Sequence, residues 1–100
     1  MSKAAERVTV ACTFWDPNQR RIVVHEIKVD TTLGPKMLAI RHACQEFARA
    51  KGFPGWAQPA GVEDSARWLV FNASSGTAHF VRAFPNKEAA EMMVLHQHCG

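Results

Sequence analysis

The chain has 100 residues, of which 47 % are hydrophobic and 21 % are charged, and its formal net charge is +3. These values are typical of one folded domain with its own hydrophobic core, and they argue against a disordered chain and against a strongly basic nucleic-acid binder. No apolar run approaches the roughly 20 residues that cross a bilayer, and no secretory signal is recognisable, so we expect a cytoplasmic protein without membrane contact. Three cysteines without close spacing, Cys12, Cys44 and Cys99, are typical of reduced thiols.

A β-hairpin is predicted at the start of the chain. Over residues 7–14 apolar side chains alternate with threonine and alanine, which predicts a half-buried strand. Asp16-Pro17-Asn18 then suits a type I turn, because proline fixes the backbone dihedral at the second turn position. Residues 21–29 are rich in β-branched side chains and are predicted to return as the second strand.

The most clearly marked helix is predicted over residues 31–51. Its apolar residues follow one another at steps of four, three, four and three, which places them on one helix face. They are Leu33, Met37, Ile40, Cys44 and Phe47. Thr31 or Thr32 is expected to cap the N-terminus, and Gly52 is expected to end the helix in a left-handed conformation.

The second half of the chain is predicted to repeat the order of two strands and a helix. Residues 52–66 contain three glycines and two prolines and are predicted to form a long loop. Strands follow over 67–72 and 77–84, joined by a turn at 73–76. Asn86 is expected to cap a helix over 87–99. The inward face of this helix is predicted to carry Ala89, Met92, Met93 and His96.

These elements predict one α+β domain over residues 1–100, with residues 1–6 frayed. The order is ββαββα, and the expected architecture is a four-stranded antiparallel sheet with two helices on one face. A β-grasp-like arrangement, in which the first hairpin cradles the helix over 31–51, is the alternative.

Apolar side chains on both faces of the strands raise a further question. The strands over 21–29, 67–72 and 77–84 carry apolar residues on both sides, and strands of this kind are usually covered on both sides. If both helices lie on one face, the loop over 52–66 or another subunit must cover the other face. A symmetric homodimer is therefore expected.

Patterns that would indicate catalysis, a metal or a cofactor are weak. His96 and His98 point about 200° apart on a helix, which does not favour a shared metal ion. Cys44 lies on the predicted buried stripe, where thiols are usually inert, and a Cys44–His25 catalytic pair depends on a strand register that the sequence does not fix. We therefore assign no catalytic, metal or cofactor residue and lean away from an enzyme.

The favoured hypothesis is a small non-enzymatic binding or regulatory module that acts through protein–protein contacts as a homodimer. Trp15 and Trp56, which lie in predicted loops, are its candidate partner-binding residues, since loops seldom carry tryptophan without a packing or binding role. The alternative is a nucleic-acid-binding accessory protein. Its candidate phosphate contacts are Arg20, Arg21, Arg41, Arg49 and Lys51.

Overall fold

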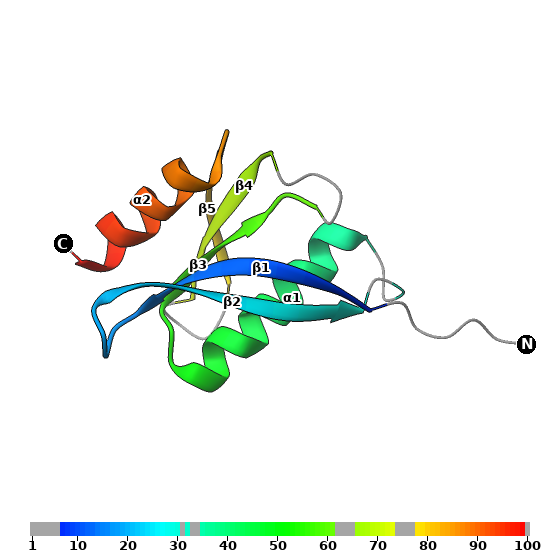
Figure 1. The fold of residues 1–100 in the computed structure, drawn as a ribbon, viewed down its shortest axis with the longest axis horizontal. Helices are drawn as coiled ribbons and strands as arrows, with labels where there is room; N and C mark the ends of the chain where they lie inside the picture. Colours follow the sequence, from blue (N-terminus) through cyan, green and yellow to red (C-terminus); the bar gives the residue numbers. More distant parts are fainter. Residues whose placement is uncertain (1–6, 31, 33–34, 62–65, 74–77, 100) are drawn as a thin grey trace, which may run out of the picture.

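A computed structural model describes residues 7–30, 32, 35–61, 66–73 and 78–99, with the side chains of 97–99 left out (Figure 1). The elements in chain order are β1 (Arg7–Asp16), β2 (Arg21–Asp30), α1 (Lys36–Lys51), β3 (Gly55–Pro59), β4 (Trp68–Asn72), β5 (His79–Phe84) and α2 (Lys87–Cys99). The fold is α+β. The predicted fraying of residues 1–6 lies outside the described residues, as does nearly all of the predicted turn at 73–76.

The sheet has five antiparallel strands in the order β2-β1-β3-β4-β5. The prediction of four strands is wrong, because Gly55–Pro59, inside the predicted loop, forms the central strand. Its glycine and its proline stand at the two ends of the strand, where they interrupt little of the hydrogen-bond ladder. All five residues of β3 are buried between neighbours on either side. Partner strands thus override a local composition that favours a loop.

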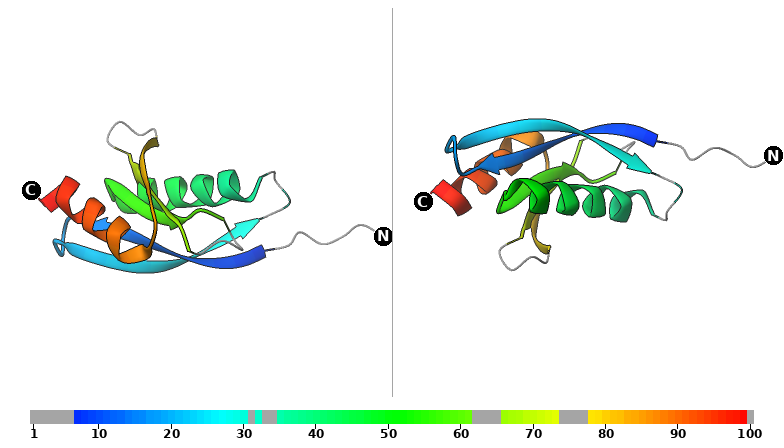
Figure 2. Two further views of the ribbon diagram at one scale, coloured as in Figure 1. Left: turned by 90° about the horizontal axis from the view of Figure 1, so that it is seen from above. Right: turned by 90° about the horizontal axis from the view of Figure 1, so that it is seen from below.

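The two helices cover opposite faces of the sheet, so the prediction that both lie on one face is also wrong (Figure 2). On β1, the side chains of Cys12 and Phe14 pack with the α1 residues Ile40 and Cys44. The next side chain, Thr13, points the other way, and its hydroxyl donates a 3.0 Å hydrogen bond to Glu91 on α2. The second apolar face of the sheet is therefore covered by α2.

Helix α1 begins later than predicted and ends as predicted. Its first residue is Lys36, directly after Pro35, whereas the backbone and hydroxyl of Thr32 both donate to the Asp30 carboxylate. Thr31 lies outside the described residues. At the other end Gly52 has φ 77°, and the N–H groups of Gly52 and Phe53 donate to the carbonyls of Arg49 and Ala48. This Schellman motif turns the chain directly into β3.

The buried stripe of α1 is Ile40, Cys44 and Ala48. Met37, predicted to lie inside, is 45 % exposed. The β-grasp-like alternative placed the first hairpin against this helix, and in the structure β1 and β2 do contact α1. None of the helices within the described residues has both the length and the apolarity needed to cross a membrane.

Helix α2 starts where the sequence predicts but faces the sheet with different residues. The Asn86 side chain accepts a 2.8 Å hydrogen bond from the backbone N–H of Ala89, which confirms the cap. The residues buried against the sheet are Ala90 and Val94. Of the predicted face, Met93 packs beside them, whereas Met92 is 54 % exposed and His96 is exposed as well. Ala90 and Val94 pack with Trp15, Ala57, Trp68 and Val70. The sheet selects this face because Ala90 is small enough to let the helix approach closely.

The burial of Val94 leads to a test of this docking. We expect Val94→Ala to lower the free energy of unfolding by about 2 kcal/mol, because it removes two buried methyl groups and leaves a cavity. Met92→Ala, on the exposed side of the same helix, should change it by less than about 0.5 kcal/mol. Urea unfolding measures both values. A larger loss for Met92→Ala would mean that α2 docks through the face predicted from the sequence.

Candidate functional site

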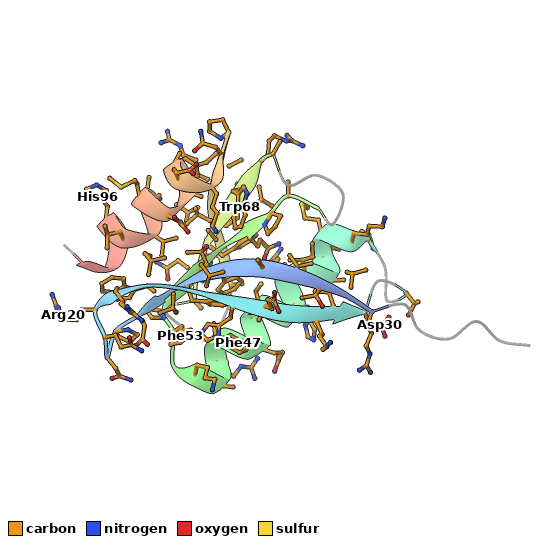
Figure 3. The ribbon with its side chains drawn as sticks, viewed as in Figure 1. Arg20, Asp30, Phe47, Phe53, Trp68 and His96 are labelled. Atoms are coloured by element: carbon orange, nitrogen blue, oxygen red, sulfur yellow. The ribbon has the colours of Figure 1, made fainter. Side chains whose placement is uncertain are left out.

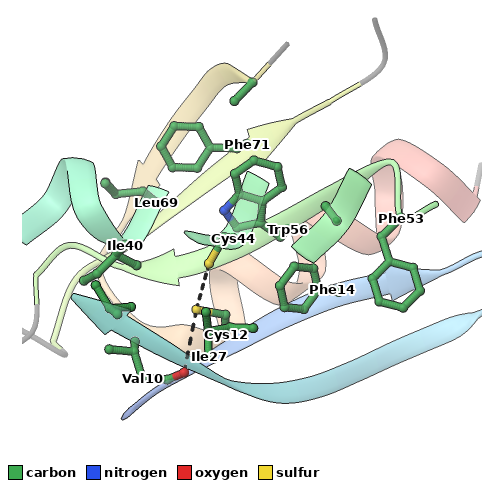
Figure 4. Packing of buried hydrophobic residues seen from close by; sticks show 13 residues of the cluster. Val10, Cys12, Phe14, Ile27, Ile40, Cys44, Phe53, Trp56, Leu69 and Phe71 are labelled. Carbon is green, nitrogen blue, oxygen red and sulfur yellow. Dashed lines mark hydrogen bonds between the residues drawn. The ribbon is translucent and has the colours of Figure 1, made fainter. Parts of the chain in front are cut away.

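Both tryptophans that were predicted to contact a partner lie in the core. Trp56 is fully buried on β3, where its ring stacks on Phe71 at 5.3 Å between centroids (Figure 4). Its indole N–H donates a 2.9 Å hydrogen bond to the side-chain carbonyl of Gln58, which is also fully buried. Trp15 is buried on the opposite face against α2. Neither ring is exposed on the surface.

The Trp56–Gln58 hydrogen bond is a buried polar contact in this core. Gln58→Met should lower the free energy of unfolding by about 1–3 kcal/mol, because the indole N–H then stays buried without an acceptor. The double variant Trp56→Phe/Gln58→Met removes donor and acceptor together. A double-mutant cycle by urea unfolding measures the coupling, which should be favourable by about 1 kcal/mol. Additive losses would contradict the role of the hydrogen bond.

Cys12 and Cys44 form a thiol pair inside the core. Their Sγ atoms lie 3.0 Å apart, one on β1 and one on α1, and both residues are fully buried (Figure 4). Burial raises the pKa of the Cys44 thiol well above its ordinary value, and the neighbouring thiol raises that pKa further. A thiol in this environment stays neutral, and a neutral thiol is a poor nucleophile.

The raised pKa of Cys44 predicts how stability depends on pH. In the unfolded chain the thiol loses its proton near its ordinary value of 9.0, whereas the folded chain keeps the proton to higher pH. The folded state then binds more protons, so the free energy of unfolding falls as the pH rises above about 9, by up to about 1.4 kcal/mol per pH unit. Urea unfolding with a reductant present, from about pH 8 to pH 10.5, measures this slope.

Cys44→Ala is the matched variant for that measurement. Its stability should decline less steeply over the same interval, because the buried Cys44 thiol with its raised pKa is gone. All other side chains are the same in both proteins, so the comparison isolates Cys44. Identical slopes would show that Cys44 does not couple protonation to folding.

His25 belongs to an aromatic cluster. It lies opposite Cys12 in the ladder between β1 and β2, so it does face α1. Its ring packs against Phe47, Phe14 and Phe53, with centroid distances of 4.8, 5.9 and 6.0 Å. Phe47 and Phe53 lie together beside the first hairpin (Figure 3). Among the described residues, no group of three or more His, Cys, Asp or Glu side chains could hold a metal ion.

The structure distributes the five candidate phosphate contacts over four places. Arg20 stands exposed at the hairpin tip with φ 54° (Figure 3). Arg49 forms a 3.1 Å ion pair with Glu46 on the exposed side of α1. Arg41 lies over the Phe71 ring, and Arg21 and Lys51 line a common cavity.

An apolar surface lies where α1 leaves the sheet uncovered. Helix α1 crosses β1, β2 and β3, while β5 at the sheet edge is exposed along most of its length. Phe80 on β5 is 56 % exposed, and its ring meets Phe71 edge-on at 5.6 Å. Beside it lies an apolar hollow of about 210 Å³. The hollow is lined by Met37, Arg41, Leu69, Phe71 and Phe80, which together with Val81 we call the β5 surface.

Arg41 closes one side of the β5 surface. Its guanidinium carbon lies 5.5 Å from the centroid of the Phe71 ring, and one guanidinium nitrogen donates a 3.5 Å hydrogen bond to the carbonyl of Ala78. These contacts hold the Arg41 side chain over the Phe71 ring and beside Ala78, the residue that precedes β5. A residue predicted as a phosphate contact thus forms a wall of an apolar hollow.

The β5 surface was not predicted from the sequence, although the pattern of apolar residues in the last strand is a signal for it. The strand over 77–84 was predicted to be apolar on both sides, which required a cover for each side. Met37 follows the periodicity of the buried stripe, so nothing local shows that it stays exposed. Its exposure depends on where the first turn of α1 lies over β4 and β5. Comparison with known protein families, curated proteins and solved structures found no match to this chain.

Proposed function

We propose that the protein is a non-enzymatic binding module that associates with a second copy of itself through the β5 surface. The observation that carries this proposal is the apolar side chains on the open edge of β5. The homodimer expected from the sequence was based on an uncovered second face of the sheet. Because α2 covers that face, the proposed contact moves to the edge.

The two edge strands of the sheet differ in the side chains that they expose. On β2 the exposed residues include Arg21, Glu26 and Lys28, and charges of this kind discourage pairing with another strand. On β5 the exposed residues are His79, Phe80, Val81, Arg82 and Ala83, so Arg82 is the only Asp, Glu, Lys or Arg side chain on this edge. Backbone groups along an edge strand can pair with a further strand, and apolar side chains beside them favour such pairing. The contrast therefore favours β5 as the association edge.

Symmetry makes a second copy a suitable occupant of this edge. A two-fold axis beside β5 brings two β5 strands together in antiparallel orientation, which is the pairing used throughout this sheet. Phe80 and Met37 of the two copies then meet beside the new pair of strands. The contact buries the apolar hollow on both copies and extends the sheet from five strands to ten.

The extent of the β5 surface sets the strength that we expect. Strand β5 has six residues, and the hollow is lined by five. Stable dimers bury about 1,200–2,000 Å² in total, and a contact through one short strand lies at or below the lower end of that range. We therefore expect a dissociation constant in the micromolar range.

Light scattering coupled to gel filtration tests this proposal. At high micromolar concentration the wild-type mass should approach twice the chain mass of 11.1 kDa, and dilution should return it to the monomer mass. Phe80→Glu should remain monomeric at every concentration, because it places a charge at the centre of the interface. Circular dichroism checks that this variant is folded.

Val24→Glu is the matched control, since Val24 is 49 % exposed on β2, the opposite edge strand. It introduces the same charge and should leave dimerisation unchanged. A monomeric wild type at the highest concentration would contradict the proposal. Equal weakening by both variants would show that added charge, and not the β5 surface, governs association.

A further inference from the structure

An open cavity of about 630 Å³ lies beside the first hairpin, away from the β5 surface. The hairpin turn, the first half of β2 and the chain at the end of α1 form its walls. Its polar and aromatic lining includes Asn18, Gln19, Arg21, His25, Lys51 and Phe53. The cavity therefore brings side chains of the first hairpin together with Lys51 and Phe53, which lie at least 26 positions later in the sequence.

Two cations face this cavity without an acidic partner among the described residues. Arg21 and Lys51 are both exposed, and neither forms an ion pair there. Elsewhere on the surface, cations do form pairs, as Arg49 does with Glu46 at 3.1 Å and Lys87 with Glu91 at 3.9 Å. The positive charge at the cavity is thus available to a ligand.

The one acidic residue in the cavity wall is engaged by the turn. Asp16 lies opposite Arg21 at the end of the hairpin ladder. One carboxylate oxygen accepts the backbone N–H groups of Asn18 and Gln19 at 2.9 and 3.2 Å, and the other accepts the side-chain amide of Gln19 at 3.1 Å. These bonds hold the carboxylate, which is largely buried, in the turn. They also fix the turn that borders the cavity.

Aromatic rings support the cationic side of the cavity. The Lys51 ammonium lies 5.9 Å from the centroid of Phe47, which favours a position close to the ring. His25 and Phe53, which both line the cavity, have ring centroids 6.0 Å apart at 30°. Charged donors beside a low-dielectric aromatic wall interact with an anion more strongly than they would in open water.

We propose that this cavity binds a phosphate group. Arg21 supplies a planar guanidinium that suits a tetrahedral oxyanion, and Lys51 supplies a mobile ammonium on the other wall. The side-chain amide of Asn18 is a further donor at the same rim. The site is independent of the proposed self-association, because β2 and β5 are opposite edges of the sheet.

Titration with inorganic pyrophosphate, followed by the backbone amide NMR spectrum at about 20 mM salt, tests this proposal. Amide shifts should concentrate in residues 16–25 and 51–53. Arg21→Gln and Lys51→Gln should each weaken binding by about fivefold or more, because each removes a charge-assisted hydrogen bond. Absence of localised shifts at millimolar pyrophosphate would overturn the proposal.

Arg49→Gln is the matched control, since Arg49 lies two residues before Lys51, is paired with Glu46 and lines a different hollow. It makes the same change in net charge and should leave pyrophosphate affinity within about twofold of wild type. Equal weakening by all three variants would show diffuse attraction by net charge and would overturn the site. Phe80→Glu should leave pyrophosphate binding unchanged whether or not the protein dimerises.

A second titration, with a short single-stranded oligonucleotide, identifies the source of the phosphate. If Arg21→Gln and Lys51→Gln weaken oligonucleotide binding while Arg49→Gln does not, the cavity accepts the phosphate of a nucleic-acid backbone. If pyrophosphate alone binds with that dependence, the ligand is a small phosphorylated molecule. Binding of both probes that is insensitive to Arg21→Gln and Lys51→Gln would place the phosphate elsewhere and overturn the proposal.

Discussion

The pairing of β3 with both β1 and β4 is the constraint on which the rest of the structure depends. Without it the chain would consist of two hairpins, each too small to bury an apolar surface of its own. Residues Thr13 and Phe14 of β1 lie opposite Ala57 and Trp56, and all five residues of β3 lie opposite β4. Two backbone hydrogen bonds flank the ladder between β3 and β4. The N–H of Ala73 donates to the carbonyl of Pro54, and the N–H of Ala60 donates to the carbonyl of Arg67. One continuous sheet results.

A central strand that alternates its side chains gives the sheet two cores. Trp56 points to the α1 side and stacks on Phe71, whereas Ala57 points to the α2 side and lets that helix approach. The two helices are offset along the sheet, so they do not lie directly opposite each other across it. Helix α1 lies over β1, β2 and β3, and α2 contacts β3 and β4 more than the first hairpin. This offset leaves one face of β5 and the rim of the first hairpin exposed, which are the two places where we propose binding.

The positions of the reactive side chains explain why a binding role is favoured over catalysis. The thiols of Cys12 and Cys44 face each other in the core, and burial keeps the Cys44 proton in place by raising its pKa. His25 is held among phenylalanine rings. What the described surface offers is an apolar edge at one end of the sheet and a cationic cavity at the other. Both are features through which we propose that the protein recognises a partner or ligand.

The sequence by itself determined the features that depend on neighbours in the chain. The hairpin over β1 and β2, the end of α1 at Gly52 and the Asn86 cap follow from turn chemistry and capping, which act within a few residues. The burial of Cys44 and the exposure of His42 and Arg49 follow from helical periodicity. Only the tertiary structure decided that Gly55–Pro59 is a strand, because its partners on β1 lie more than 40 residues earlier and those on β4 lie 9 to 17 residues later. It also decided that Ala90 and Val94 face the sheet, that Trp15 and Trp56 are core residues, and that Phe80 is exposed. These outcomes depend on the order of the strands and on the placement of two helices over a five-stranded sheet, which no local pattern encodes.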